Sequence, residues 1–270
     1  MLFRKDPCGI ICVILTYAML LHCLYVVVCI LIIPLFNESF YGTLNAFLIC
    51  TLVFLATLSH GRAAYSDPGF VPLPKRKLDF SDLKTNSTTN PLLKVNEEGW
   101  TVCNRCDTYR PARSHHCRIC KRCVRRLDHH CPWINNCVGE FNQKYFILFL
   151  FYIGLTSLYA VSFIIWSLIV FPQKSEAQII HSIVICIEAC LFGIFVITVF
   201  VDQIQSIIDD RSLIDSLKLD KESRNTPRVL PSKRVLFENV FGSGPIICWL
   251  LPCDLRNSNK INDSPDAYTV

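Results

Sequence analysis

The sequence predicts an all-α polytopic membrane protein, with four transmembrane helices and a cytosolic two-zinc cysteine-rich domain between helices 2 and 3. The first observation is composition: 51% of the 270 residues are hydrophobic and only 18% are charged, whereas a soluble domain has about 25% charged residues. The second is the grouping of the apolar residues into four long stretches. The third is that seven of the 16 cysteines lie between Cys103 and Cys137. This composition excludes a disordered chain.

The four apolar stretches are close to the length needed to cross a bilayer, about 20 residues. They cover residues 10–36, 43–58, 145–171 and 179–201, and the second is the shortest. None carries the polar face at helical spacing that a soluble core helix would show. The first is too long for the apolar core of a secretory signal peptide. We therefore predict four transmembrane helices.

The distribution of Lys and Arg predicts the orientation. Fifteen of the 27 basic residues lie between Gly61 and Lys144, nine follow the fourth stretch and two precede the first, whereas the two short loops together hold only Lys174. Because cytosolic loops are enriched in Lys and Arg, both termini and the central segment are expected in the cytosol. We predict four parts. Residues 1–60 hold the N-terminus and the first two spans, and residues 61–144 form a cytosolic loop with the cysteine-rich domain, whose core is 101–139. Residues 145–203 hold the last two spans, residues 204–270 form a cytosolic tail, and residues 72–98 are a polar linker.

The cysteine-rich segment points to metal binding and to a nucleophile. In the reducing cytosol a cysteine cluster favours metal binding or catalysis over disulfides, and paired Cys-x2-Cys units have zinc-site spacing. The segment holds seven Cys and four His, and two tetrahedral zinc ions would use eight of these eleven. Three residues are left over. A cysteine beside His and Asp, as in Asp128-His129-His130-Cys131, has the surroundings that an activated thiolate needs.

This arrangement resembles the DHHC protein S-acyltransferases (palmitoyltransferases), and is most similar to their Golgi-type animal members. The similarity runs from Cys103 to Gly139 and includes the cytosolic position between spans two and three. Asp67-Pro68-Gly69 matches the Asp-Pro-Gly element of the family. Asn239-Val240-Phe241-Gly242 matches its C-terminal element, in which the Asn is expected to bond backbone groups. Ser212-Leu213-Ile214-Asp215 departs from the family's Thr-Thr-x-Glu at its second position, which leaves any role of Leu213 in doubt.

The resemblance implies two structural zinc ions and a catalytic trio. It implies that one ion is held by Cys103, Cys106, His116 and Cys123, and the other by Cys117, Cys120, His130 and Cys137. It further implies that Cys131 is the acyl-accepting nucleophile, His129 its base and Asp128 the residue that orients the base.

The resemblance also implies that the donor is a long-chain acyl-CoA such as palmitoyl-CoA. Arg110, Arg113 and His115 are our candidates for the CoA phosphates, although basic residues here are equally suited to anionic lipid heads. The acyl cavity is expected to begin near Trp133 and Phe149. Thr156 is expected to lie on the same helix face, leaving room for sixteen carbons and tolerating eighteen.

The implied partners are the bilayer and proteins with a juxtamembrane cysteine at the cytosolic face, in the Golgi or endoplasmic reticulum membrane. No nucleic acid is expected, because the basic run is short. Tyr268-Thr269-Val270 is a candidate PDZ ligand. Cys8, Cys12, Cys248 and Cys253 lie near membrane edges and are candidates for acylation or for packing.

Two interpretations from other classes compete with the enzyme. A non-enzymatic membrane zinc scaffold explains eight ligands, but it leaves Asp128, His129 and Cys131 without a task. A transporter should carry polar contacts within its spans, and beyond Glu188 there are few. Glu188 is an intramembrane acid and therefore a functional hypothesis, but we favour a packing residue between helices. For His22 and His181 we expect packing or interface roles.

Overall fold

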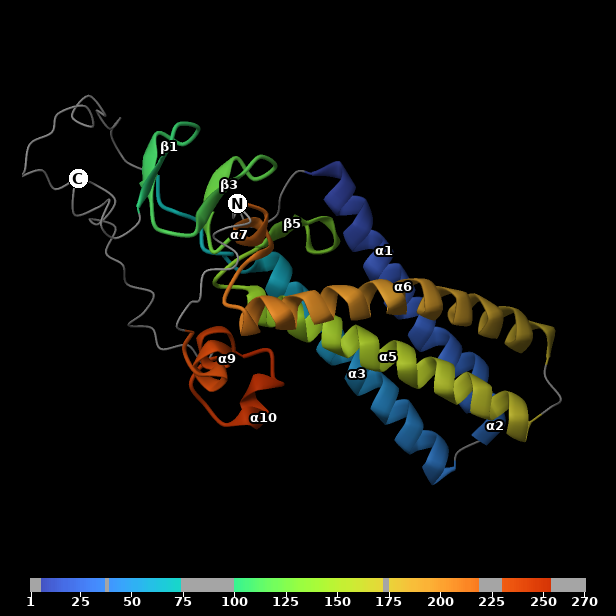
Figure 1. Cartoon of the computed structure of the whole chain (residues 1–270). Helices are drawn as coiled ribbons and strands as arrows, with labels where there is room; N and C mark the ends of the chain where they lie inside the picture. The colour runs from blue at the N-terminus through green and yellow to red at the C-terminus, as the bar shows by residue number, and fades with distance from the viewer. Residues whose placement is uncertain (1–5, 37–38, 74–99, 172–174, 219–229, 254–270) are drawn as a thin grey trace, which may run out of the picture.

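The computed structural model of the chain describes residues 6–36, 39–73, 100–171, 175–218 and 230–253 (Figure 1). Most of the linker expected over 72–98, and the ending at residues 268–270, lie outside these ranges. Within them the structure is mostly helical, with a small cysteine-rich domain at one end of the long helices. The prediction of the fold class is confirmed.

Four long helices are apolar enough to span a membrane. The first is continuous and contains a π-helical stretch, and the others are single α-helices. Their bounds are α1 Pro7–Tyr25, η1 Val26–Ile32 and α2 Ile33–Phe36 for the first, then α3 Phe40–Tyr65, α5 Gln143–Val170 and α6 Glu176–Ile208. The second span, the shortest stretch of the sequence, is a full 26-residue helix, because it continues past the apolar run into Arg62 and Tyr65.

Polar residues cap the N-termini of three of these helices. Asp6 caps α1 by accepting a hydrogen bond from the Gly9 N–H at 3.2 Å, with Pro7 in the first helical position. Ser39 caps α3, and Ser175 forms a capping box with Gln178 at the start of α6. Such side chains satisfy N–H groups that have no partner within the helix.

Helix α5 is the centre of the bundle, since it packs against both α3 and α6. Helix α1 instead packs its N-terminal half against the turn η3, Pro132–Ile134, of the cysteine-rich domain. At Gly9 a Cβ atom would meet the Asn135 side chain at 2.4 Å, so a side chain larger than hydrogen does not fit. The start of α1 is thereby held beside the residues that follow Cys131.

The cysteine-rich domain consists of three antiparallel two-stranded hairpins. They are β1–β2, Thr101–Cys103 with Thr108–Arg110; β3–β4, Ser114–Cys117 with Arg122–Arg125; and β5–β6, His129–Cys131 with Asn136–Val138. Hairpins this short are marginal by themselves. Their turns use non-glycine residues at positive φ, including Asp107, Lys121 and Asn135. The stability of the domain must therefore come from its metal sites and from its contacts with the helices.

Two asparagines bind the domain to the end of α3. Asn136 Nδ2 lies 3.0–3.2 Å from the carbonyl oxygens of Ala63, Ala64 and Ser66. Asn142 donates to the carbonyls of Ala63 and Cys137 and accepts from the Gly139 N–H. These bonds satisfy carbonyls at the helix end that have no partner within the helix.

The Asp-Pro-Gly element predicted at Asp67 makes a second attachment. Asp67 Oδ1 accepts from the N–H groups of Gly69 and Phe70, both at 2.8 Å, and Gly69 takes φ +105°, a conformation open to glycine. The Gly69 carbonyl then accepts from the Arg125 N–H at 2.8 Å. The element fastens the chain leaving α3 onto β4.

In its described residues the tail has three short helices, α7 Leu213–Lys218, α9 Lys233–Phe241 and α10 Ile246–Trp249. Lys144 at the start of α5 is buried, and its Nζ donates to the carbonyls of Phe241, Cys248 and Cys253. Asn239 does not meet its expectation, since it is exposed on α9 and its side chain makes no hydrogen bond to another described residue. Lys144 of α5, rather than Asn239, makes hydrogen bonds to backbone carbonyls of the tail.

Gly139→Ala tests the docking of the domain. The new Cβ would lie 2.4 Å from the Pro68 carbonyl oxygen and 3.1 Å from that of Arg125, so backbone must move, which we expect to cost about 1–3 kcal/mol. The measurement is the thermal unfolding midpoint of the purified protein, which should fall. Gly154→Ala in α5 is the control, because nothing lies within 4 Å of its Cβ and its midpoint should hold or rise. Equal midpoints for Gly139→Ala and the wild type would contradict this packing.

Candidate active site and metal centres

Two groups of four side chains have the composition and spacing of zinc sites. In each group, three cysteine sulfurs and one histidine nitrogen lie within 4.8 Å of one another. The groups are Cys103, Cys106, His116 and Cys123, and Cys117, Cys120, His130 and Cys137. These are the two sets that the resemblance implied.

The donor atoms fit zinc in both distance and chemistry. In the second group the sulfurs of Cys120 and Cys137 lie 3.4 Å apart, and they lie 3.4 and 3.6 Å from His130 Nδ1. A tetrahedron built on zinc–sulfur bonds of about 2.3 Å has edges of about 3.8 Å. Three buried thiols and an imidazole suit zinc. His130 Nε2 also lies 3.8 Å from Asp6 Oδ2, so a carboxylate stands behind this histidine.

The middle hairpin serves both groups. His116 pairs with Cys123 across β3–β4 and supplies the first group, whereas the next residue, Cys117, supplies the second. Successive side chains of a strand point to opposite faces, so neighbours on β3 reach different ions. The second group is completed by His130 and Cys137, which are paired across β5–β6.

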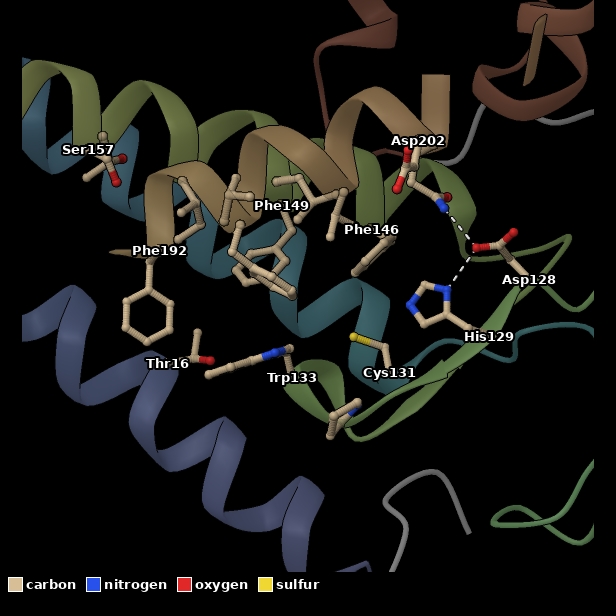
Figure 2. A pocket seen from close by; sticks show the side chains of 18 of the residues that line it. Thr16, Asp128, His129, Cys131, Trp133, Phe146, Phe149, Ser157, Phe192 and Asp202 are labelled. Carbon is tan, nitrogen blue, oxygen red and sulfur yellow. Dashed lines mark hydrogen bonds and ion pairs between the residues drawn. The ribbon is translucent and has the colours of Figure 1, made fainter. Parts of the chain in front are cut away.

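The same alternation separates the metal site from the reactive residues on β5. His130 points to the second metal group, and the residues on either side of it, His129 and Cys131, point the other way. Figure 2 shows these two side chains next to each other at one end of a cavity. One three-residue strand therefore carries a zinc ligand on one face and a cysteine–histidine pair on the other.

Asp128 holds His129 in place. His129 Nδ1 lies 2.8 Å from Asp128 Oδ2, and Gln203 of α6 donates to the same oxygen at 2.8 Å. The Leu213 N–H donates to the other carboxylate oxygen at 2.7 Å. Burial raises the pKa of Asp128, and the hydrogen bonds from His129, Leu213 and Gln203 outweigh it, so the pKa ends below its usual value. Both oxygens of the buried Asp128 carboxylate therefore accept hydrogen bonds.

His129 lies between Asp128, to which it is hydrogen-bonded, and the Cys131 side chain. Burial lowers its pKa, but the bond to Asp128 and the neighbouring Cys131 thiol outweigh this and raise the pKa to about 9. Its ring also packs on Phe146, with centroids 5.5 Å apart. A histidine bonded to a carboxylate and next to a thiol can take the thiol proton and stabilise the thiolate.

A cavity of about 690 Å³ leads away from Cys131 between α1, α5 and α6 (Figure 2). Its walls are mainly apolar, and the residues that line it include Trp133, Phe149 and Thr156. The Thr156 hydroxyl donates to the Tyr152 carbonyl of its own helix at 2.7 Å. The prediction that these three residues share a cavity with Cys131 agrees with this geometry.

Trp133 is fixed by a histidine that the sequence analysis did not single out. His60 of α3 is buried and its Nε2 lies 2.9 Å from the Trp133 carbonyl oxygen, so Nε2 carries the proton. In the neutral ring, Nδ1 then accepts from the Tyr17 hydroxyl of α1 at 2.9 Å. The Trp133 ring packs edge-on against Phe192 of α6. Three helices thus meet at the residue that opens the cavity.

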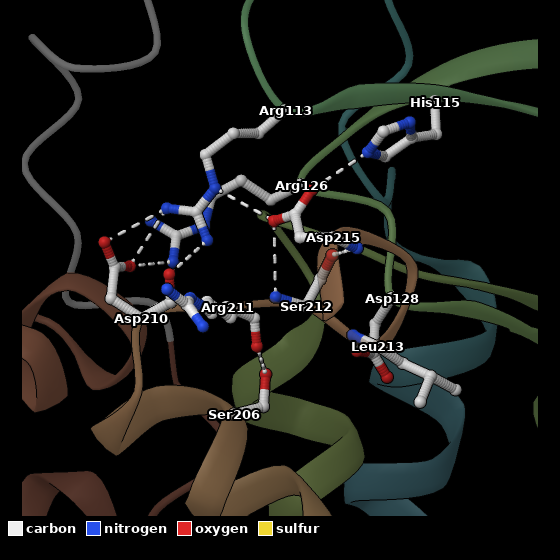
Figure 3. A network of polar contacts seen from close by, with 10 residues as sticks. All are labelled: Arg113, His115, Arg126, Asp128, Ser206, Asp210, Arg211, Ser212, Leu213 and Asp215. Atoms are coloured by element: carbon white, nitrogen blue, oxygen red, sulfur yellow. Dashed lines mark hydrogen bonds and ion pairs between the residues drawn. The ribbon is translucent and has the colours of Figure 1, made fainter. Parts of the chain in front are cut away.

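Arg113 and His115 face carboxylates of the tail (Figure 3). Arg113 Nε donates to Asp215 at 3.0 Å, and its Nη1 lies 3.0 Å from Asp210. His115 Nε2 lies 3.0 Å from the other Asp215 oxygen. Burial raises the pKa of Asp215, and its bonds to His115 and Arg113 outweigh this and hold the pKa well below its usual value. These pairs fasten α7 to the cysteine-rich domain.

That attachment explains the departure at Leu213. Ser212 and Asp215 cap α7 reciprocally, since the Asp215 N–H lies 3.2 Å from Ser212 Oγ and the Ser212 N–H 3.3 Å from Asp215 Oδ2. The cap aims the Leu213 N–H at Asp128. A main-chain donor thereby occupies the carboxylate, and no hydroxyl at position 213 is needed.

The third phosphate candidate, Arg110, donates from Nε to the Thr101 hydroxyl across β1–β2 at 2.8 Å. None of Arg110, Arg113 and His115 is among the residues that line the cavity, whereas Arg211 is. Gln203, His60 and Arg211 were missed because each reaches the site from a distant segment, and no local motif marks them. Leu213 was left in doubt because its side chain departs from the motif, whereas its contact with Asp128 is made by the main chain.

Comparisons with known proteins find related sequences over most of the chain. The sequence model described as "DHHC palmitoyltransferase" matches residues 96–220. Palmitoyltransferase ZDHHC3 of Rattus norvegicus is 36% identical over 279 residues, covering 100% of this chain and 88% of that protein. Palmitoyltransferase ZDHHC7 of Rattus norvegicus is 33% identical, covering 93% and 80%. Probable protein S-acyltransferase 13 of Arabidopsis thaliana is 31% identical, covering 77% and 72%.

The two adjacent histidines should behave differently when replaced. His130→Ala should lower the metal content from about two zinc ions per chain toward one and lower thermal stability, because a structural zinc contributes folding energy. His129→Ala should keep both ions, because its ring faces away from the metal group. Elemental analysis of the purified proteins measures this. Equal zinc loss in both variants would contradict the opposite orientation of the two side chains.

Proposed function

As a member of the DHHC palmitoyltransferase family this chain is a protein S-acyltransferase, and we propose that it works through an acyl-enzyme on Cys131. Family membership excludes the non-enzymatic scaffold and the transporter. The observation that carries the proposal is the line of contacts from Asp128 through His129 to Cys131 at the mouth of an apolar cavity. The two zinc sites hold the hairpins that present these residues.

In the first half-reaction Cys131 attacks the acyl-CoA. His129 takes the thiol proton, and the Cys131 thiolate adds to the thioester carbonyl carbon. The bond from that carbon to the CoA sulfur then breaks, and CoA leaves as a thiolate that can take the proton from His129. Asp128 holds the His129 ring in one orientation and stabilises the imidazolium, as in catalytic triads generally.

In the second half-reaction the acyl group passes to a protein. A substrate cysteine gives its proton to His129 and attacks the Cys131 thioester, and Cys131 leaves as the thiolate. His129 serves as base in both half-reactions, which is ping-pong chemistry. The substrates we propose are membrane-associated proteins with a cysteine at the cytosolic face, for which a second lipid anchor gives stable attachment.

The cavity suits a long acyl chain. At about 0.8 kcal/mol per buried CH2, fourteen methylenes are worth on the order of 11 kcal/mol outside water, so the chain needs an apolar site. The cavity starts at Cys131 and runs between α1, α5 and α6 toward the middle of the spans. The thioester can thus stay at the membrane surface while its chain is buried.

For the CoA phosphates we propose Arg211, which lines the cavity mouth, ahead of Arg113 and His115, which are paired with Asp210 and Asp215. The number of Lys and Arg residues between α3 and α5 supports a cytosolic active site. The resemblance to Golgi-type members supports the Golgi or endoplasmic reticulum membrane as the location.

Cys131→Ser tests the acyl-enzyme. Incubated with labelled palmitoyl-CoA, the wild type should take up a label that hydroxylamine removes, and Cys131→Ser should take up none while keeping about two zinc ions. His129→Ala should slow labelling by roughly 10²–10⁴-fold, the usual effect of losing a general base. The proposal fails if Cys131→Ser still labels at the wild-type rate, or if the zinc-loaded wild type does not label at all.

Thr156→Phe tests the depth of the cavity. Thr156 is 3% exposed and its side chain lines the cavity, so a phenyl ring there should fill the space that a sixteen-carbon chain needs. We expect preference to shift from sixteen toward fourteen carbons when acyl-CoAs of different length compete for Cys131. Thr198→Phe, on the exposed face of α6, is the matched control. An unchanged preference would assign Thr156 to helix packing alone.

A further inference from the structure

Three titratable side chains meet within the spans, far from Cys131. His22 of α1 lies between two residues of α6: its Nδ1 is 3.3 Å from Glu188 Oε2, and its Nε2 is 3.3 Å from His181 Nδ1. The edge of the Tyr25 ring meets His181, with centroids 5.9 Å apart. The cluster links α1 to α6 through two polar contacts and one ring contact.

Its geometry is not that of a metal site. His22 turns different nitrogens to its two neighbours, so the three side chains do not point at one common centre. Within the described ranges, only the two cysteine-rich groups meet the spacing for a metal ion. The cluster is instead a hydrogen-bonded row that ends in a carboxyl group. An ionisable group inside a membrane is costly and usually has a function.

The carboxyl end of this row lies at the far end of the acyl cavity. Glu188, Cys23 and Ile185 line the cavity together. Along α6, Glu188 is fifteen residues from Gln203, which bonds Asp128, and this corresponds to about 22 Å at about 1.5 Å per residue. Along α5, Ala160 also lines the cavity and is fourteen residues from Phe146, about 21 Å. Both helices therefore place the end of the cavity at the same depth.

The walls between these ends are mainly apolar. Phe146 and Phe149 of α5 and Phe192 and Val196 of α6 line this stretch. Thr16, Thr156 and Ser157 bring hydroxyls to the lining, and those of Thr16 and Thr156 are bonded back to their own helices. Glu188 is the carboxyl group at the far end, with 29% of its side chain exposed. A chain that ends above Glu188 meets mainly apolar groups, whereas a longer chain must press a methyl group against the carboxyl.

We propose that Glu188, held by His22, is a specificity-determining residue that limits acyl-chain length by its polarity. The inference rests on the proposed acyl-enzyme at Cys131. Thr156 limits length through the space it leaves, and Glu188 limits it through the unfavourable contact between a carboxyl and a terminal methyl. A chain that carries a hydroxyl at its far end escapes this limit, because the hydroxyl can bond to Glu188.

The experiment uses the full-length protein and follows acylation of Cys131 by intact mass, with palmitoyl-CoA and stearoyl-CoA in competition. Glu188→Leu removes the carboxyl at similar volume and should raise the ratio of eighteen- to sixteen-carbon product by roughly tenfold, the usual effect of a few added apolar contacts. Glu188→Gln keeps a hydrogen-bond partner for His22 and should stay near wild type. Thr198→Val, the same kind of change outside the cavity, should leave the ratio unchanged.

A second measurement needs no variant. Wild-type protein should take stearoyl-CoA with a terminal hydroxyl in preference to stearoyl-CoA itself, and Glu188→Leu should reverse that order. An unchanged chain-length ratio in Glu188→Leu, or equal use of the two eighteen-carbon donors by the wild type, would overturn the role of Glu188. Absence of any acyl group on wild-type Cys131 would instead overturn the proposed acyl-enzyme, so the two failures are distinguishable.

Discussion

The alternation of side chains along one three-residue strand is the constraint on which the rest of the site depends. Strand β5 has His130 on one face and both His129 and Cys131 on the other. Metal binding by His130 and Cys137 orients the strand, and the orientation of the strand decides where the thiol points. A shift of register by one residue would exchange the two faces. A zinc ion held by His130 would therefore set the position of the proposed nucleophile without touching the substrate.

Asp128 joins segments that are remote in sequence. Its two oxygens accept from a neighbouring histidine, from a glutamine near the end of a transmembrane helix and from the main chain of the tail. Arg113 and His115 hold that part of the tail against the hairpins through Asp215. The geometry at His129 consequently depends on the bundle, the hairpins and the tail together, so a change in any of them should alter the surroundings of the proposed nucleophile.

The sequence was sufficient for the parts of the fold that local pattern controls. Apolar length predicted the spans, and the family motif named both cysteine–histidine groups, which the structure brings together. Contacts between distant segments were not predictable: Gln203 and His60 look like ordinary helix residues until the helices are packed. The three hairpins went unpredicted because their strands are too short to show alternation. Arg113 and His115 were assigned to phosphate because basic charge was visible and its carboxylate partners, 97–102 positions away, were not.

The main-chain contact from Leu213 to Asp128 has a consequence for how such enzymes are recognised. A peptide N–H is present at every position except proline, so evolution can change the side chain at position 213 without losing the donor. A sequence search that requires a hydroxyl residue at position 213 would reject this chain, although the Asp128 carboxylate accepts hydrogen bonds at both oxygens. The informative signature is the pair Ser212 and Asp215, since their reciprocal cap aims the N–H. At position 213 the side chain differs from the family motif, but the hydrogen bond to Asp128 is kept.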